Sequence, residues 1–361
     1  MAFAKNAWYC AAFSTEVSRG LLGRKILGDG VLITRDQDGG VRAMGDRCPH
    51  RFAPLHRGER DGDSVECPYH GLRFDLTGRC VLNPHGEGRI PGAARVPTYR
   101  VEERQGVVWL WPGDSALADP AAIPDLLLID RGERLPVSGH LTMPVDYRLV
   151  LDNLMDLSHA AYLHAGTLSP SRAKRESRYD SDETSVRVNT VMRDVPTPSS
   201  QSLYFSSARG DYHSDIEWVF PGSVRQRLAM TETGEEADAG AVTRNVHLIT
   251  PETETSTHYF WIHTRNRLMD DADIDDRTRA ILSNAFLTED EPMMQACQEN
   301  MGGAEFFSLK PVYLETDFAG TRCRRTLERL IADEQRANLS AQGQPYSVRA
   351  GRNQSGLTAE P

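Results

Sequence analysis

The chain has 361 residues, enough for two domains of ordinary size, and its 39% hydrophobic and 25% charged residues are typical of a soluble globular protein. No apolar run approaches the roughly 20 residues of a membrane span. The N-terminal segment is too short and too polar for a secretory signal, so we expect a cytoplasmic protein without a membrane partner. The net charge of −10, with no basic stripe, argues against nucleic acid as a partner.

Residues 1–115 are predicted to form an all-β domain. Short alternating or apolar runs recur there, separated by Gly, Asp and Pro turns. The predicted strands cover residues 25–27, 31–35, 41–44, 64–67, 95–99 and 107–111. Residues 116–136 contain three prolines and are expected to be a connector.

The segment 137–340 is predicted to form a second, α+β domain, because strands followed by helices are typical of that class. It opens with a helix at 147–162 and ends with helices at 274–299 and 318–336. Strands are expected between them at 185–192, 202–205, 215–220, 242–250 and 256–264. The polar residues 341–361 are expected to be a disordered tail.

Two motifs in loops of the all-β domain each combine a cysteine with a histidine, Cys48-Pro-His50 and Cys67-Pro-Tyr-His70. A Rieske [2Fe–2S] centre needs this mixture, because two His replace two Cys on one of the two irons. Cys48 and Cys67 would bind one iron, and His50 and His70 the other. A structural zinc site is the alternative, but such sites usually pair Cys with Cys and His with His. The mixed motifs therefore favour a Rieske domain at 1–115.

Histidines and carboxylates also gather on the first predicted helix of the second domain. Asp156 and His159 share one face at i, i+3, but His159 and His164 diverge by about 140° around a regular helix. Both can bind one metal only where the helix unwinds or bulges, which often marks a functional site. Histidines on a solvated helix face are the alternative. Two of them near carboxylates, in a chain with a Rieske motif, favour a metal.

A non-haem Fe(II) oxygenase site needs one carboxylate beside two histidines. Glu289 and Asp290 lie within helical reach of the apolar stripe of the 274–299 helix, so either carboxylate could point inward. Pro292 is expected to kink the helix there. Periodicity alone does not choose between Glu289 and Asp290, and a solvated acidic patch is the alternative.

With both metal motifs present, the chain resembles the Rieske non-haem iron oxygenases over almost its whole length, and most closely the branch of the vanillate and dicamba O-demethylases. Seven stretches carry the resemblance. They are Asn6-Ala-Trp8-Tyr9, Cys48-Pro-His50-Arg-Phe-Ala-Pro-Leu55, Cys67-Pro-Tyr-His70-Gly-Leu, Asn83-Pro-His85-Gly, Trp111-Pro-Gly-Asp114, Asp152-Asn-Leu-Met-Asp-Leu157 with His159 and His164, and Ile249-Thr-Pro-Glu-Thr-Glu254.

The resemblance implies an antiparallel sheet flanked by helices in a catalytic domain at 137–340. It implies that Cys48, His50, Cys67 and His70 hold the cluster, and that His159, His164 and Asp290 hold a mononuclear iron.

In this family an aspartate matching Asp156 hydrogen-bonds a cluster histidine of the neighbouring subunit. This implies a head-to-tail homotrimer and an electron path from His70 through Asp156 to His159 of the next subunit. Asn153 is implied to line the iron pocket, with a capping or surface role as the alternative.

The implied reaction uses O2, with electrons from NADH that arrive through a separate reductase, with or without a ferredoxin. The chain has no G-x-G-x-x-G fingerprint and no plant-type four-Cys cluster, so it does not supply those steps itself. We expect O-demethylation of a small methoxylated aromatic acid to a phenol and formaldehyde. The alternatives are ring or methyl hydroxylation, cis-dihydroxylation and N-demethylation. A Rieske electron carrier is a distant alternative, because it would need little beyond residues 1–115.

The resemblance also suggests substrate contacts. His247 matches a position that contacts the substrate carboxylate in dicamba demethylase, which suits an anionic or phenolic ring, and a core histidine is the alternative. Ile281 stands where that relative has a Trp, which argues against dicamba itself as the substrate. Trp218, Ile281 and Phe286 are expected as apolar pocket walls, although each would also suit a plain core.

Overall fold

The computed structural model describes residues 3–130, 136–165, 167–170 and 173–342, so the predicted polar tail lies outside the described residues from position 343 onward. The two parts of the chain differ in secondary structure as expected. The described residues before 137 form strands and short 3-10 turns, and those after it form both strands and α-helices. Among the described residues, none of the helices is both long and apolar enough to cross a membrane.

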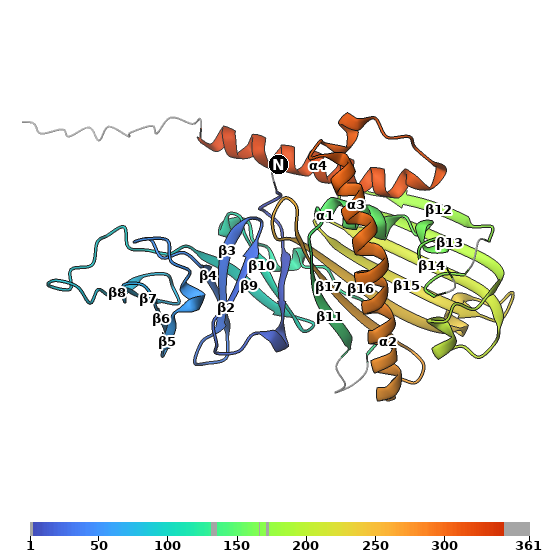
Figure 1. Cartoon of the computed structure of the whole chain (residues 1–361), viewed down its shortest axis with the longest axis horizontal. Helices are drawn as coiled ribbons and strands as arrows, with labels where there is room; N and C mark the ends of the chain where they lie inside the picture. The colour runs from blue at the N-terminus through green and yellow to red at the C-terminus, as the bar shows by residue number, and fades with distance from the viewer. Residues whose placement is uncertain (1–2, 131–135, 166, 171–172, 343–361) are drawn as a thin grey trace, which may run out of the picture.

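The N-terminal part forms two antiparallel sheets. Its strands are β1 (Tyr9–Phe13), β2 (Leu22–Ile26), β3 (Asp29–Arg35), β4 (Val41–Gly45), β5 (Glu59–Asp61), β6 (Ser64–Glu66), β7 (Arg73–Asp75), β8 (Cys80–Leu82), β9 (Thr98–Arg104) and β10 (Val107–Trp111). A six-stranded sheet has the order β1-β10-β9-β4-β3-β2, and a small sheet has the order β5-β6-β7-β8. The small sheet lies at the end of the molecule remote from the helices (Figure 1).

The C-terminal part is built on a seven-stranded antiparallel sheet in the order β11-β17-β16-β15-β14-β13-β12. Its strands are β11 (Val137–Met143), β12 (Glu176–Ser181), β13 (Ser185–Pro196), β14 (Arg209–Val219), β15 (Ser223–Thr231), β16 (Ala241–Pro251) and β17 (Thr257–Arg265). The helices are α1 (Tyr147–Met155), α2 (Ala272–Asn284), α3 (Glu291–Met301) and α4 (Phe318–Gln342), with a π-helical segment, Ala285–Asp290, joining α2 to α3.

Strand β17 shows how the two parts pack together, because it is buried along its whole length. Successive side chains of a strand point to opposite faces. Tyr259 and Trp261 pack into the core under the helices, whereas Phe260 and Ile262 pack against Trp8 of the N-terminal part. Figure 1 shows α2 and α3 crossing one face of this sheet.

The predicted fold class is confirmed, but several predicted elements are wrong. The short apolar run at 202–205 is not a strand. It overlaps a 3-10 turn, Gln201–Leu203, since runs of this length do not distinguish the two. Strands β1, β5, β7, β8, β11, β12 and β15 were not predicted. The helix expected at 147–162 ends at Met155, and the one expected at 318–336 continues to Gln342.

Candidate metal centres and active-site cavity

Two loops with the same backbone pattern bring the first set of candidate ligands together. Cys48 and His50 lie after β4, and Cys67 and His70 lie between β6 and β7. In the first loop the Cys48 N–H donates to Ala53 O and its carbonyl accepts from Phe52 N. In the second, Cys67 N–H donates to Leu72 O and its carbonyl accepts from Gly71 N. Gly71 has a φ of +70°, a left-handed conformation that glycine adopts without strain.

The two loops present their thiols inward and their imidazoles outward. Cys48 and Cys67 are 2% and 3% exposed, and the rings of His50 and His70 are 4.5 Å apart. Nδ1 of His70 is buried without a hydrogen-bond partner among the described residues, which fits an atom that would bind a metal ion. Burial raises the pKa of the Cys48 thiol to about 11, and the adjacent Cys67 thiol adds to the rise. An iron ion would displace these protons.

The spacing of these four donors favours a two-iron cluster over zinc. The ligand atoms of a tetrahedral zinc site lie roughly 3.5 Å apart, given bonds of about 2.0–2.3 Å. Among the described residues, three candidate ligand atoms lie within 4.8 Å of one another in one place, at His159, His164 and Asp290. The four residues of the Cys48 and Cys67 motifs form no such group. The Cys48 and Cys67 motifs therefore span more space than a single ion fills.

The second candidate site forms where α1 stops. Asp146 caps the N-terminus of α1 by accepting a hydrogen bond from Arg148 N at 2.9 Å, and the helix ends at Met155 with Asp156 in an extended conformation. The next residues form only a 3-10 turn, His159–Ala161. The angular argument against a shared metal therefore no longer applies, and the rings of His159 and His164 lie 5.3 Å apart.

The π-helical segment supplies the carboxylate. Asp290 Oδ1 lies 3.0 Å from His164 Nε2 and 3.6 Å from His159 Nε2. The choice between Glu289 and Asp290, which periodicity left open, falls on Asp290 as the residue that faces both Nε2 atoms. Two imidazoles and one carboxylate are the donor set of non-haem Fe(II) oxygenases, so the residues present fit a mononuclear iron.

The outer nitrogen of each ligand imidazole is also bonded. His159 Nδ1 is 2.7 Å from the backbone oxygen of Asp156, and His164 Nδ1 is 2.5 Å from Glu289 Oε2. Such partners fix the ring orientation of metal-bound histidines and leave Nε2 for the metal. Burial lowers the pKa of His159, so its imidazole is neutral and able to bind a cation.

Asn153, on the last turn of α1, lies beside this set. Its Nδ2 donates to Asp290 Oδ1 at 3.0 Å and lies 3.4 Å from His159 Nε2. Asp156, unlike Asn153, contacts His159 through its backbone. Its backbone oxygen is hydrogen-bonded to His159 Nδ1, and its carboxylate accepts from Ser158 N at 2.8 Å. Within one chain the small sheet lies at one end of the molecule, well away from α1 and the site that follows it (Figure 1).

A cavity opens on the three ligands, and three of the four predicted substrate residues line it. His247, Ile281 and Phe286 contribute to its wall. Trp218 does not. It shares a strand face with Ile216, but it lies further along β14, where the core beneath α1 and α4 covers it completely. We therefore correct the expectation that Trp218 contacts substrate.

His247 is held by a buried neighbour. Its Nδ1 is 2.7 Å from the hydroxyl of Tyr259, and both residues pack against the ring of Phe286. Burial lowers the pKa of His247 to about 4 and raises that of Tyr259, so both side chains are neutral at physiological pH. A Tyr259 hydroxyl that donates to Nδ1 leaves the Nε2–H of His247 as a donor.

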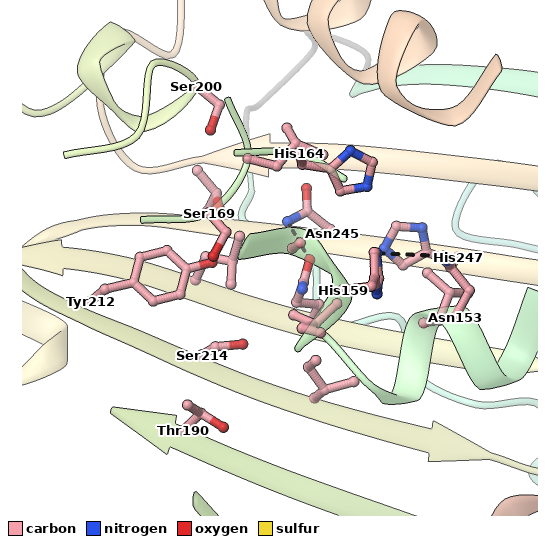
Figure 2. Close-up of a pocket in the computed structure, with 18 of the residues that line it drawn as sticks. Asn153, His159, His164, Ser169, Thr190, Ser200, Tyr212, Ser214, Asn245 and His247 are labelled. Carbon is pink, nitrogen blue, oxygen red and sulfur yellow. Dashed lines mark hydrogen bonds between the residues drawn. The ribbon is translucent and has the colours of Figure 1, made fainter. Parts of the chain in front are cut away.

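Sequence reasoning missed a polar row on the floor of the cavity. Asn245 accepts from His263 Nδ1 at 2.7 Å and donates to Gln226 at 3.1 Å. These residues are direct cross-strand neighbours on β15, β16 and β17. Asn245 and His247 are i, i+2 on β16, and this period of two was the available signal. Figure 2 shows Asn245 between the histidine cluster and a group of hydroxyl residues.

Comparison with known proteins relates both parts of the chain to one enzyme family. Residues 7–100 match the Rieske [2Fe-2S] domain family, and residues 143–333 match the vanillate O-demethylase oxygenase C-terminal domain family. Chloroacetanilide N-alkylformylase, oxygenase component, of Rhizorhabdus wittichii is 41% identical, with 94% of this chain and 99% of the relative covered. Dicamba O-demethylase, oxygenase component, of Stenotrophomonas maltophilia is 38% identical, with 91% and 98% covered.

The fold agrees with these sequence relationships. The crystal structure of dicamba monooxygenase bound to dicamba superposes with a TM-score of 0.85 at 34% identity, covering 93% of this chain and all of that one. A further structure of that enzyme contains non-haem iron. The chain belongs to the Rieske non-haem iron oxygenases, as an oxygenase component of the branch that includes dicamba and vanillate O-demethylases, with a Rieske [2Fe–2S] cluster and a mononuclear iron as cofactors.

Proposed function

We propose that this oxygenase component removes the O-methyl group of a small methoxylated aromatic acid. The observation that carries the proposal is the cavity, which places an apolar wall, Phe286 and Ile281, and the neutral donor His247 beside the histidine and carboxylate set. Such a wall suits an aromatic ring, and a few placed polar groups orient it.

We assign the metal ligands residue by residue. The cluster ligands are Cys48, His50, Cys67 and His70. The mononuclear iron ligands are His159, His164 and Asp290, which would hold the ion through two Nε2 atoms and a carboxylate. The corresponding domain boundaries are a Rieske domain at 1–115, a connector at 116–136 and a catalytic domain at 137–340.

When bound at this site, the iron supplies the activation of O2. The rest falls to the chain's own side chains. His247 is positioned to donate a hydrogen bond to an oxygen of the substrate, and Phe286 and Ile281 keep water from the ring. Asn153 keeps Asp290 in place through its 3.0 Å hydrogen bond. The net reaction takes O2, two electrons and two protons. One oxygen atom enters a methyl C–H bond and the other leaves as water, and the resulting hemiacetal breaks to a phenol and formaldehyde.

Electrons would enter from NADH through a separate reductase, with or without a ferredoxin, in the cytoplasm. We propose that they pass between subunits of a head-to-tail homotrimer, from His70 through Asp156 to His159 of the next subunit. Exposed aromatic rings beside the cluster ligands support a partner there, since Phe52 and Tyr69 are 68% and 64% exposed. Native mass measurement tests the trimer. Asp156→Asn should abolish multiple-turnover activity while both metal centres remain loaded.

N-dealkylation is a second candidate, favoured by the 41% identical relative that is named an N-alkylformylase. The same oxygen insertion at a carbon bound to nitrogen would release an aldehyde and leave an N–H group, which in an anilide is an amide. A Rieske electron carrier is disfavoured, because residues 143–333 match an oxygenase domain.

Oxygen uptake with a surrogate reductase decides between these reactions. The panel should pair methoxylated aromatic acids with N-alkyl anilides, with formaldehyde and the aromatic products assayed in parallel. Uptake matched by formaldehyde from the methoxylated acids supports O-demethylation, and uptake limited to the anilides supports N-dealkylation. Uptake without aldehyde would indicate ring or methyl hydroxylation or cis-dihydroxylation.

A further inference from the structure

The cavity has a second polar region on the side away from the metal ligands. Figure 2 shows Thr190, Tyr212 and Ser214 across the cavity from His159, His164 and His247. The region between them holds the polar row of Asn245. The proposed demethylation accounts for the residues beside the iron but leaves this distal end without a role.

A row of hydroxyl groups crosses three strands at the distal end. Ser177 pairs with Thr190 between β12 and β13, and Thr190 pairs with Ser214 between β13 and β14. The Ser177 and Thr190 hydroxyls are 3.0 Å apart. Ser177 is exposed whereas Ser214 is only 4% exposed, so the row leads from the cavity rim into its interior.

The next row brings Tyr212 and Arg175 to the same end. Tyr212 pairs with Met192, and Arg175 directly precedes Glu176, whose own partner is Val191. Continuing this antiparallel register places Arg175 opposite Met192, one strand away from Tyr212. Burial raises the pKa of Tyr212 and the positive charge of Arg175 opposes that rise, in agreement with this proximity.

Several buried polar groups at this end have no protein partner. Tyr212 is 4% exposed, and its hydroxyl makes no hydrogen bond to another described residue. Gln201 Oε1 and Thr243 Oγ1 are also buried and unpaired within the described part of the chain, although both residues line the cavity. Buried polar groups in native proteins almost always have a partner, either protein, water or ligand.

Arg175 gives the distal end its charge. It carries the one permanent positive charge among the described residues that line the cavity. Its Nη1 donates to the backbone oxygen of Leu157 at 2.9 Å, and its Nη2 is buried without a partner among the described residues. A guanidinium anchored by one nitrogen and unsatisfied at another is suited to a carboxylate or sulfonate.

We propose that this distal end is a second substrate subsite, in which Arg175 and Tyr212 hold an anionic group, a carboxylate or sulfonate, while the alkyl group of the same substrate faces the iron. The subsite rests on the proposed function, because it orients that function's substrate. It predicts that the anionic and alkyl groups lie at opposite ends of the ring, so para-substituted acids should bind better than ortho-substituted ones.

Ligand binding to the metal-loaded protein without reductant tests the subsite independently of turnover. Calorimetry would compare 4-methoxybenzoate with the nearly isosteric but neutral 4-methoxybenzamide, and with 2-methoxybenzoate. The variants are Arg175→Met, Arg175→Lys and Tyr212→Phe. Arg178→Met is the matched control, because Arg178 is exposed on β12, the strand that Arg175 directly precedes, and does not line the cavity.

We expect the unaltered protein to prefer 4-methoxybenzoate over both other ligands. Arg175→Met should weaken its binding about tenfold to a hundredfold, with the amide affected less than about threefold. Arg175→Lys should retain most of the preference, and Tyr212→Phe should reduce it severalfold. If Arg175→Met loses iron or unfolds through its lost bond to Leu157, Arg175→Lys and Tyr212→Phe still decide the question.

Equal binding of acid and amide by the unaltered protein, or equal losses for both ligands in Arg175→Met, would overturn the subsite. Failure of the proposed function has a different signature. In that case 4-methoxybenzoate binds in an Arg175-dependent manner but yields no formaldehyde. If an acid is demethylated but its affinity is the same in Arg175→Met, the proposed function is supported and the proposed subsite is refuted.

Discussion

Glu289 and Asp290 are consecutive residues whose carboxylates contact opposite nitrogens of one imidazole. Glu289 Oε2 is 2.5 Å from Nδ1 of His164, and Asp290 Oδ1 is 3.0 Å from its Nε2. Neighbouring residues of a regular α-helix point about 100° apart. Here both lie in the π-helical segment Ala285–Asp290, a distortion that frequently accompanies functional sites. One carboxylate is therefore available to the metal and the other to the back of a metal ligand.

Replacing His159 with alanine should remove the mononuclear iron and leave the Rieske cluster intact. The reason is that the two proposed centres use separate residues, which lie far apart in the molecule. Iron analysis and the visible absorption of the cluster measure this, together with oxygen uptake. His213→Gln is a suitable control, because His213 lies on β14 in the same part of the chain but does not line the cavity. Loss of the cluster absorption in His159→Ala would contradict the assignment.

Glu289→Gln and Glu289→Ala should weaken the binding of mononuclear iron about tenfold to a hundredfold, because the outer partner of a metal-bound histidine fixes its orientation and basicity. Competition with a chelator measures the iron affinity without relying on turnover. Glu291→Gln serves as the control, since no hydrogen bond joins Glu291 to His164 among the described residues. An equal effect of both substitutions would show that Glu289 has no special part.

Tyr259→Phe should raise the KM for the substrate about fivefold to tenfold, which corresponds to one hydrogen bond of roughly 1 kcal/mol, and should change kcat little. The substitution keeps the ring that packs on Phe286 but frees Nδ1 of His247 to change its hydrogen-bonding state. Steady-state kinetics with the identified substrate measure both constants. A lower kcat with unchanged KM would instead place the Tyr259 hydroxyl in the chemical step.

Stability in acid should depend on His140, which lies where the two parts of the chain meet. Its ring stacks on Phe260 at 4.2 Å and its Nε2 is 3.2 Å from His258 Nδ1, with Arg24 and Glu16 also facing it. Burial, helped by the charge of Arg24, lowers the pKa of His140 to about 4. The unfolded chain, with a histidine pKa of about 6.5, binds more protons between these values.

Stability contributed by neutral His140 is therefore complete above about pH 6.5 and declines as the pH falls toward 4. Between pH 7.5 and 5 this group alone should cost about 2 kcal/mol. His140→Gln should lose correspondingly less stability over that interval, as measured by urea unfolding at the two pH values. An unchanged pH dependence would show that the ring is solvated and titrates normally.

The chain's local patterns indicated the chemistry of the Cys and His motifs, whereas the mononuclear iron ligands were implied by the family resemblance. Cys48-Pro-His50 and Cys67-Pro-Tyr-His70 each place their ligands in one short loop, so spacing alone indicates what they bind. Strands were likewise predicted at the positions of β14, β16 and β17 in the large sheet. Very short strands such as β5, β7 and β8 were missed, because three residues carry no measurable period.

The sequence could not predict which of two neighbouring side chains points toward the histidines, and this needed the tertiary structure. Helical periodicity treated Glu289 and Asp290 alike, since a π-helical segment does not follow the 100° rule. It also continued α1 through His159, although the helix ends at Met155 and only the irregular segment beyond lets two histidines face one ion.

By itself the sequence determined the family and the two cofactors, because the Cys and His motifs have a short spacing and the remaining motifs resemble one family over almost the whole chain. The tertiary structure alone decided which side chains share the cavity. It buried Trp218 in the core and placed His247, Phe286 and Arg175 around the cavity that His159, His164 and Asp290 also line. These residues come from strands and turns far apart in the chain, and their proximity arises from sheet register and packing, which no local pattern encodes.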